Sequence, residues 1–162
     1  MENSKQSGQE IHFERIKSSN VSDVCELSDT LTSVQRRMVA DNARSIAQAH
    51  CSENCWMRAI YADKVLVGFI LMHFGSDFED GIDCPGAFLW RFMISLPFQG
   101  KGYGKKALLR LIQELKTKGY KELFTSCGQG EASPEGFYKD FGFMPTGEFY
   151  DDEIELIISF LD

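Results

Sequence analysis

The sequence lacks the long apolar segments that membrane proteins and secreted precursors carry. No run of about 18 apolar residues occurs, so we expect no transmembrane helix. The opening stretch MENSKQSGQE is polar and contains no apolar segment, which argues against a secretory signal. We therefore expect a cytoplasmic protein with no membrane partner. Residues 1–10 would be a flexible lead-in, and residues 11–162 would form a single domain.

Positive charge and paired cysteines are also scarce. The 17 Lys and Arg are outnumbered by 24 Asp and Glu, and the net charge of −7 argues against a nucleic-acid partner. Five cysteines at irregular spacing indicate reduced, mostly buried thiols. His50, Cys51 and Cys55 form the pattern H-C-x-x-x-C, which lacks a fourth ligand and a second cysteine pair, so we expect no metal.

Hydrophobic periodicity and turn residues predict an α/β domain with a mixed sheet. Strands are expected at 11–16, 56–61, 65–74, 87–94, 123–127 and 153–160, and helices at 21–31, 34–50, 101–118 and 134–141. Asn20 and Ser133 can cap two of the helices, and Gly119 can end a third. The order is β-α-α-β-β-β-α-β-α-β, in which a hairpin comes first and helical crossovers follow.

The most informative stretch is RFMISLPFQGKGYGKKALLRL, residues 91–111, where three glycines separate a strand from a helix. Gly100, Gly102 and Gly104 allow a sharp turn and let a ligand approach the backbone N–H groups. The N–H groups at a helix start lack partners and carry the positive end of the helix dipole. Lys101, Lys105 and Lys106 are unfavourable there unless an anion is bound. The loop therefore predicts a polyphosphate site.

Two common phosphate motifs do not fit this loop. The dinucleotide pattern G-x-G-x-x-G fails because Lys105 stands at its third glycine. The P-loop pattern G-x-x-x-x-G-K-[ST] fails because Gln99 stands at its first glycine and Lys106 stands at its Ser or Thr. The pattern that fits is Q-x-x-G-x-G, at residues 99–104.

This loop resembles the coenzyme A loop of the GNAT superfamily of N-acetyltransferases. A second shared motif is Tyr-x-x-x-Gly-Phe, at residues 138–143. The segments LWRFMI, GYGKKAL, GEASPEGFYKDFGF, PTGE and VADNARSIAQA resemble the bacterial spermine/spermidine (diamine) N-acetyltransferases. The resemblance covers roughly residues 11–160 and implies a mixed, mostly antiparallel sheet flanked by helices.

The resemblance also implies a cosubstrate, acetyl-CoA, and the residues that hold it. The loop amides would bind its pyrophosphate, and the preceding strand would pair with its pantetheine arm as an added strand would. The implied cofactor-binding residues are Phe92, Met93, Ile94, Gln99, Gly100, Lys101, Gly102, Tyr103, Gly104 and Lys105.

Two catalytic roles follow from the resemblance and from the chemistry of acetyl transfer. Tyr138 would lie near the thioester sulfur and protonate the departing thiolate, and a backbone N–H of residues 92–94 would stabilise the oxyanion. Many relatives carry Asn seven residues before this tyrosine, where this chain has Glu131. Glu131 is therefore a candidate base, with Glu135, His50 and His73 as alternatives. Cys127 could carry an acyl group, but we expect direct transfer in a ternary complex.

The acceptor would be a small-molecule amine, and the charge pattern suits a polyamine such as spermidine or spermine. Acidic residues cluster at Asp77, Glu79, Asp80 and Asp83, and at Glu148, Asp151, Asp152, Glu153 and Glu155. Such clusters are also typical of solvated loop tips. An aminoglycoside, an amino acid or a protein amine remains an alternative acceptor, and a CoA-binding sensor without turnover is an alternative function. We also expect a homodimer, as is common in the family.

Overall fold

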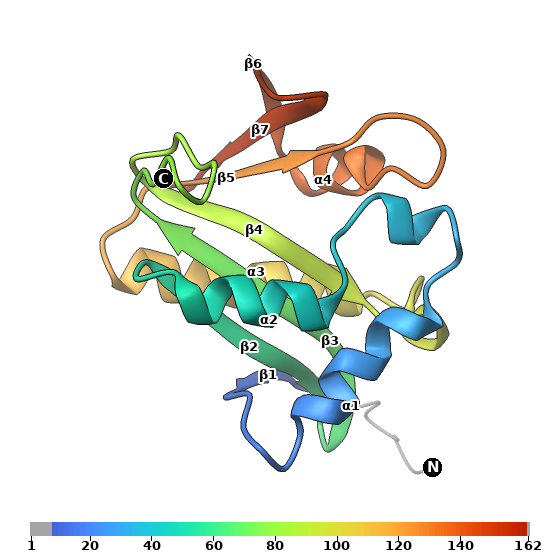
Figure 1. The fold of residues 1–162 in the computed structure, drawn as a ribbon. Coiled ribbons are helices and arrows are strands. Elements are labelled where there is room, and N and C mark those ends of the chain that lie inside the picture. The colour runs from blue at the N-terminus through green and yellow to red at the C-terminus, as the bar shows by residue number, and fades with distance from the viewer. Residues whose placement is uncertain (1–7, 162) are drawn as a thin grey trace, which may run out of the picture.

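The computed structural model describes residues 8–161, which form a seven-stranded sheet with helices on both faces (Figure 1). The strands are β1 (Ile11–Glu14), β2 (Cys55–Ala62), β3 (Val65–Phe74), β4 (Ala87–Ile94), β5 (Glu122–Cys127), β6 (Met144–Tyr150) and β7 (Glu153–Ser159). Their order in the sheet is β1-β2-β3-β4-β5-β7-β6. Neighbouring strands are antiparallel except β4 and β5, which are parallel. The mixed, mostly antiparallel sheet is as expected.

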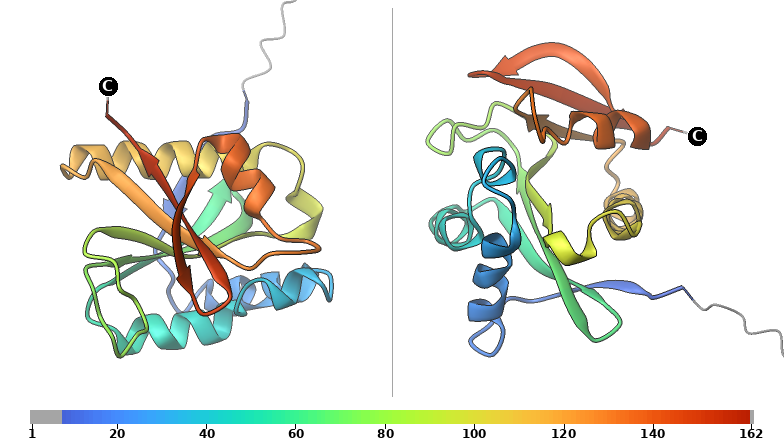
Figure 2. Two further views of the ribbon diagram at one scale, coloured as in Figure 1. Left: turned by 90° about the horizontal axis from the view of Figure 1, so that it is seen from above. Right: turned by 90° about the vertical axis from the view of Figure 1, so that its right-hand side faces the viewer.

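Four α-helices cover the two faces of the sheet: α1 (Val21–Glu26), α2 (Asn42–Cys51), α3 (Tyr103–Thr117) and α4 (Glu135–Phe141). Figure 2 shows α1 and α2 on one face and α3 and α4 on the other. Leu108, Leu111 and Leu115 of α3 are buried in the core of their face. Val24 of α1 and Ala49 of α2 are buried in the opposite core. Each helix buries one stripe of apolar side chains, which accounts for the two-faced architecture.

The described residues include three short 3-10 helices: η1 (Leu27–Thr30), η2 (Gln35–Arg37) and η3 (Leu96–Phe98). Of these, η1 and η2 stand where the sequence predicts α-helix. The helix expected at 21–31 continues as η1 after Glu26. The helix expected at 34–50 is broken, and α2 begins only after Asp41. The Asp41 carboxylate accepts the Arg44 N–H at 2.8 Å, so Asp41 is the N-cap of α2 and stabilises a helix that begins at residue 42.

Asn20 precedes α1 but does not cap it through its side chain. Its Oδ1 accepts the Lys17 N–H at 2.8 Å, and its Nδ2 donates to the Arg15 carbonyl. The side chain therefore closes the preceding turn. Gly119 ends α3 at a φ of +88°, as predicted. The Ser133 hydroxyl accepts the Glu135 N–H at 3.1 Å, but α4 begins one residue later than expected, with Pro134 rather than Ser133 at its N-cap position.

Strand β6 is missing from the sequence prediction. It contains Pro145 and Gly147, which disfavour strand interiors, and its pairing with β7 is irregular between Pro145 and Phe149. It lies at the edge of the sheet, where both residue types are tolerated.

The cysteines are all free thiols, as expected, but only Cys84 and Cys127 are buried; Cys51 is exposed. The end of the predicted lead-in is bonded to the turn between β2 and β3. The Glu10 N–H donates to Asp63 Oδ1 at 3.0 Å, and the Asp63 N–H donates to the Glu10 carbonyl at 2.8 Å. Residues 1–7 of that lead-in lie outside the described residues. Within residues 8–161, no helix has the length and apolar character needed to cross a membrane.

Candidate active site

A cleft of about 960 Å³ opens where β4 and β5 separate. The two strands pair only at Phe88–Phe124 and Leu89–Thr125. Beyond this point, no strand of the described residues pairs with the edge of β4 that faces β5, whereas the other edge stays paired with β3 as far as Ile94. Phe92, Met93 and Ile94, the predicted pantetheine strand, line this cleft. An unpaired strand edge is a template for an extended ligand.

The glycine loop lies at the end of the cleft where α3 begins. Gly100 and Gly102 have φ values of +72° and +85°, which side-chain-bearing residues rarely adopt. The Lys106 N–H bonds the Gly102 carbonyl at 3.1 Å, so the N–H groups of the preceding helical residues have no intrahelical acceptor. Residues 99, 100 and 102–105 line the cleft, which brings these free N–H groups to its wall. The arrangement suits an anion.

Gly104 has a different role from the other two glycines. A Cβ placed there would come within 3.2 Å of the Phe137 ring, whereas a Cβ at Gly100 or Gly102 would meet no atom of the described residues within 4 Å. Gly104 therefore lets α3 pack closely against α4. The open space at Gly100 and Gly102 leaves room for a ligand.

Gln99 holds the loop in place through its side chain. Its Nε2 donates to the Ile94 carbonyl at 2.9 Å, and its Oε1 accepts from Gln35 Nε2 at 2.8 Å. Lys101 and Lys105 are both exposed, but only Lys105 lines the cleft. The Nζ of Lys101 lies 5.7 Å from the centre of the Phe98 ring. The Tyr103 ring lines the cleft, and its hydroxyl bonds the Gln9 side chain.

Tyr138, the predicted proton donor, lies on α4 and lines the cleft with only 4% of its surface exposed. Its ring packs edge-on against Phe137 and Phe143, with centroids 5.5 and 5.2 Å away. Burial raises the pKa of the Tyr138 hydroxyl well above its ordinary value, so the group stays protonated at physiological pH. It is thus a fixed hydrogen-bond donor in a dry wall of the cleft.

The predicted base and the possible acyl carrier are less favourably placed. Glu131 is exposed on the loop between β5 and α4 and does not line the cleft, although its neighbour Ala132 does. Cys127 lines the cleft but is buried, and burial raises the pKa of its thiol. A thiol held protonated is a poor nucleophile, which favours direct transfer.

Glu153 is a site residue whose position the sequence does not reveal. It begins β7, next to Ile154, which pairs with Cys127 on β5, and it lines the cleft together with Asp152. Burial raises the pKa of the Glu153 carboxyl, the guanidinium of Arg91 opposes this rise, and the neighbouring Asp152 adds to it. The only sequence signal is its membership of the second acidic cluster.

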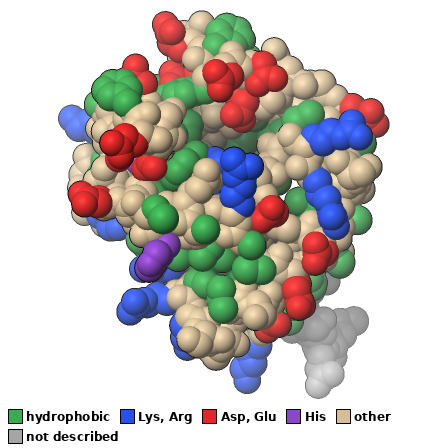
Figure 3. All heavy atoms as spheres, viewed as in Figure 1, with side chains coloured by type: hydrophobic (Ala, Val, Ile, Leu, Met, Phe, Trp, Pro, Cys, Tyr) green, Lys and Arg blue, Asp and Glu red, His purple; other side chains and the backbone are tan. Residues whose placement is uncertain are grey.

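The two acidic clusters differ in their relation to the cleft. In the first, the Asp77 carboxylate accepts the Glu79 N–H at 3.0 Å and Asp80 bonds His73, so these groups organise their own loop. In the second, Asp152 and Glu153 reach the cleft. In Figure 3, acidic side chains gather at the top of the molecule, above a hollow with basic side chains on its other side. The cleft therefore offers groups for an anion and groups for a cation.

Comparison with known proteins agrees with this architecture of a splayed sheet and a glycine loop. The sequence profile described as Acetyltransferase (GNAT) family matches residues 23–143. The chain therefore belongs to the GNAT acetyltransferase family. The expected family is confirmed by this match, and the expected fold by the solved structures described below.

Individual relatives are more distant. Over 90 residues, the chain is 32% identical to the spermine/spermidine N(1)-acetyltransferase of Bacillus subtilis strain 168 and to a probable spermine N(1)-acetyltransferase of the natto strain. The match covers 55% of this chain and 59% of each relative, less than two thirds of their length. Among solved structures, the PaiA N-acetyltransferase of Thermoplasma acidophilum, in complex with coenzyme A, superposes with a TM-score of 0.68 at 16% identity, covering 92% of this chain and 98% of that one. A GNAT family acetyltransferase from Elizabethkingia anophelis, with acetyl-CoA bound, gives 0.65 at 16%, covering 95% and 99%.

Proposed function

We propose that this protein transfers the acetyl group of acetyl-CoA to a primary amine of a polyamine such as spermidine or spermine. The transfer is direct, in a ternary complex of the protein with both substrates. The observation that carries the proposal is the cleft itself, which has free N–H groups at the start of α3 and the carboxylates of Asp152 and Glu153 in its lining.

The donor half of the cleft suits coenzyme A. The pyrophosphate would accept hydrogen bonds from the N–H groups of the glycine loop, with Lys105 adding positive charge. The pantetheine arm would pair with the free edge of β4 at Phe92–Ile94. The side chain of Gln99 positions the loop, because both of its ends are bonded to the protein, and Gln99 stays a proposed contact of the ligand.

The chemistry needs a proton donor, an oxyanion donor and a proton acceptor. The bound cosubstrate supplies a thioester, whose carbonyl carbon the amine attacks while the C–S bond breaks. A backbone N–H of residues 92–94 would stabilise the negative charge on the carbonyl oxygen. The Tyr138 hydroxyl would give its proton to the departing thiolate, and the proton released by the acetylated nitrogen would restore the hydroxyl.

The amine must first lose a proton, because an alkylammonium is only about one part in a thousand neutral at pH 7. Glu153 suits this task, because burial moves its pKa toward neutrality and its carboxylate lines the cleft. Glu131, the base candidate from the sequence, stays a second proposal; it would act through water from its exposed loop. The pH dependence of kcat/KM in Glu153→Gln and Glu131→Gln distinguishes the two proposals. Activity falls at low pH as the base becomes protonated, and only the variant that lacks the base should lose this fall.

A polyamine is the favoured acceptor because it carries a positive charge every few carbons. One amine must be neutral to react, while the others stay charged and need anionic partners. Asp152 and Glu153 provide such partners in the cleft wall, and Asp151 adjoins them. The partial match to enzymes named for spermine and spermidine supports the same choice.

A panel of amines, with release of the CoA thiol as the readout, tests this function. We expect spermidine and spermine to have the highest kcat/KM, above a short monoamine, an aminoglycoside, an amino acid and a peptide with a free N-terminus. A higher value for any of the last three would reassign the acceptor. Tight acetyl-CoA binding with no turnover on any amine would instead indicate a CoA sensor. A homodimer and a cytoplasmic location are further proposals, to be tested by sedimentation and cell fractionation.

A further inference from the structure

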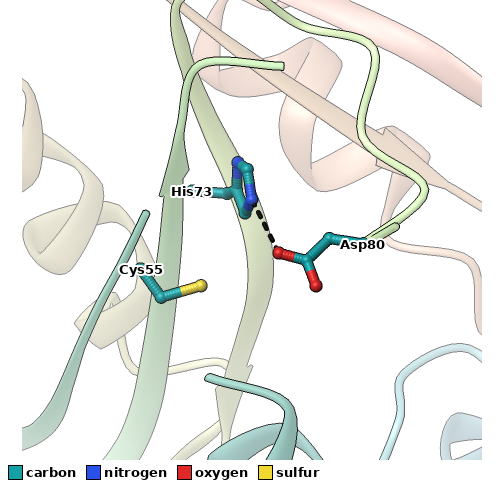
Figure 4. A group of neighbouring side chains, drawn as sticks. All are labelled: Cys55, His73 and Asp80. Carbon is teal, nitrogen blue, oxygen red and sulfur yellow. Dashed lines mark hydrogen bonds and ion pairs between the residues drawn. The ribbon is translucent and has the colours of Figure 1, made fainter. Parts of the chain in front are cut away.

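A second group of reactive side chains lies outside the cleft, on the sheet face that carries α1 and α2. Cys55, at the start of β2, is the direct cross-strand partner of His73, near the end of β3. Asp80 comes from the loop after β3 and reaches the same place (Figure 4). None of the three lines the cleft, and the proposed transfer reaction uses none of them.

The donor atoms of these three side chains converge. His73 Nε2 and Asp80 Oδ2 are 3.0 Å apart, and one ligand atom from each of the three residues lies within 4.8 Å of the other two. Figure 4 shows the thiol of Cys55 pointing into the space beside the His73–Asp80 pair. In a tetrahedral zinc site, bond lengths of about 2.0–2.3 Å place the ligand atoms about 3.4–3.6 Å apart. A bound zinc would therefore require the side chains to adjust from the arrangement seen here, in which the ligand atoms lie within 4.8 Å of one another.

His73 is not explained as an ordinary core histidine. Its side chain is 0% exposed, and within the described part of the chain its Nδ1 has no hydrogen-bond partner. The ring packs edge-on against Trp90 at 5.5 Å, so apolar residues would fill the same space without the cost of burying an imidazole. The residue type thus points to a function of the other nitrogen, Nε2, which faces Asp80.

The charges of the group favour a divalent cation. A thiolate, a carboxylate and a neutral imidazole carry two negative charges together, which Zn²⁺ would neutralise in this half-buried place. Sulfur and imidazole donors select zinc-like metals over Mg²⁺ and Ca²⁺, which prefer oxygen ligands alone.

We propose that Cys55, His73 and Asp80 form a zinc site with water as the fourth ligand, which fastens the loop of residues 75–86 to the sheet. The sequence pattern H-C-x-x-x-C does not identify this site, because Cys55 is the only one of its three residues that belongs to the site. Cys51 is exposed. The site is structural and separate from the cleft, so it is compatible with acetyl transfer that needs no metal.

Cobalt provides the direct test, because a thiolate bound to Co²⁺ gives a strong charge-transfer absorption. The purified full-length protein is treated with a chelator, transferred to a non-thiol reductant and titrated with Co²⁺. We expect one Co²⁺ per chain with a sulfur-to-cobalt band, displaced by Zn²⁺ but not by Mg²⁺. Cys55→Ser should abolish the band, and Asp80→Asn should weaken binding at least tenfold.

Cys51→Ser is the matched control, because it removes a nearby thiol that does not belong to the group. This variant should keep the band, and circular dichroism should show that all variants are folded. Zn²⁺ should raise the Tm of the wild type and of Cys51→Ser but not that of Cys55→Ser. The proposal is overturned if the wild type shows no band, if Cys55→Ser retains it, or if Cys51→Ser loses it. The His73–Asp80 pair would then be a loop anchor without metal.

Discussion

Replacing Gly102 by valine separates the conformational role of the glycine loop from its role in binding. Gly102 has a φ of +85°, and a Cβ there would lie more than 4 Å from every atom of residues 8–161 outside its immediate neighbours. The substitution should therefore cost about 1–3 kcal/mol of stability through backbone strain, without a steric clash in the free protein. The added methyl groups would instead occupy space that a bound pyrophosphate needs. We expect acetyl-CoA affinity to fall at least tenfold, which is about 1.4 kcal/mol.

Gly119→Val is the matched control for this experiment. Gly119 follows the other end of α3 with a φ of +88°, and its surroundings are equally open. Both variants should lose similar stability in thermal unfolding, but only Gly102→Val should lose affinity in calorimetric titration with acetyl-CoA. Unchanged affinity in Gly102→Val, or an equal loss in both variants, would refute the assignment of the loop as the phosphate site.

Further substitutions test the reaction and the acceptor. Tyr138→Phe keeps the buried ring, so kcat should fall about 10²-fold at unchanged acetyl-CoA affinity; a wild-type kcat would place thiolate protonation elsewhere. Burial raises the pKa of Glu153 in the folded protein, so the folded state loses stability as the pH rises above about 4.3, the pKa of an unfolded glutamate. Glu153→Gln should therefore raise the Tm at neutral pH but not at acidic pH, and it should lower kcat/KM. High salt should raise KM for spermidine more than for a monoamine, because it screens surface charge. The double substitution Asp151→Asn with Asp152→Asn should reduce the salt dependence of KM for spermidine, and Asp77→Asn should not. If KM for spermidine changes equally with salt in all variants, Asp151 and Asp152 do not bind the acceptor.

The parts of the site that depend on local sequence could be predicted. Glycines at a strand-to-helix junction indicate a helix start with exposed N–H groups, whatever the rest of the fold is. Strand 87–94 is rich in apolar and aromatic residues, and its predicted bounds match β4. The tyrosine of α4 was found through a motif that the resemblance supplied.

The parts that depend on strand pairing could not be predicted. Glu153 reaches the cleft only because β7 inserts between β5 and β6, and a single sequence does not specify this order. Strand β6 was missed because Pro145 and Gly147 argue against a strand, although an edge position tolerates them. Cys55 and His73 are 18 positions apart in the sequence, and only the register of the β2–β3 hairpin makes them neighbours.

Analysis of the acetylated product tests the central claim most directly. The protein is incubated with isotopically labelled acetyl-CoA and spermidine, and the products are identified by mass spectrometry. The account predicts that each spermidine molecule that reacts carries one labelled acetyl group on a primary amine, with an equal amount of free CoA. Acetyl-CoA that stays intact, or CoA released without acetylated spermidine, would contradict it.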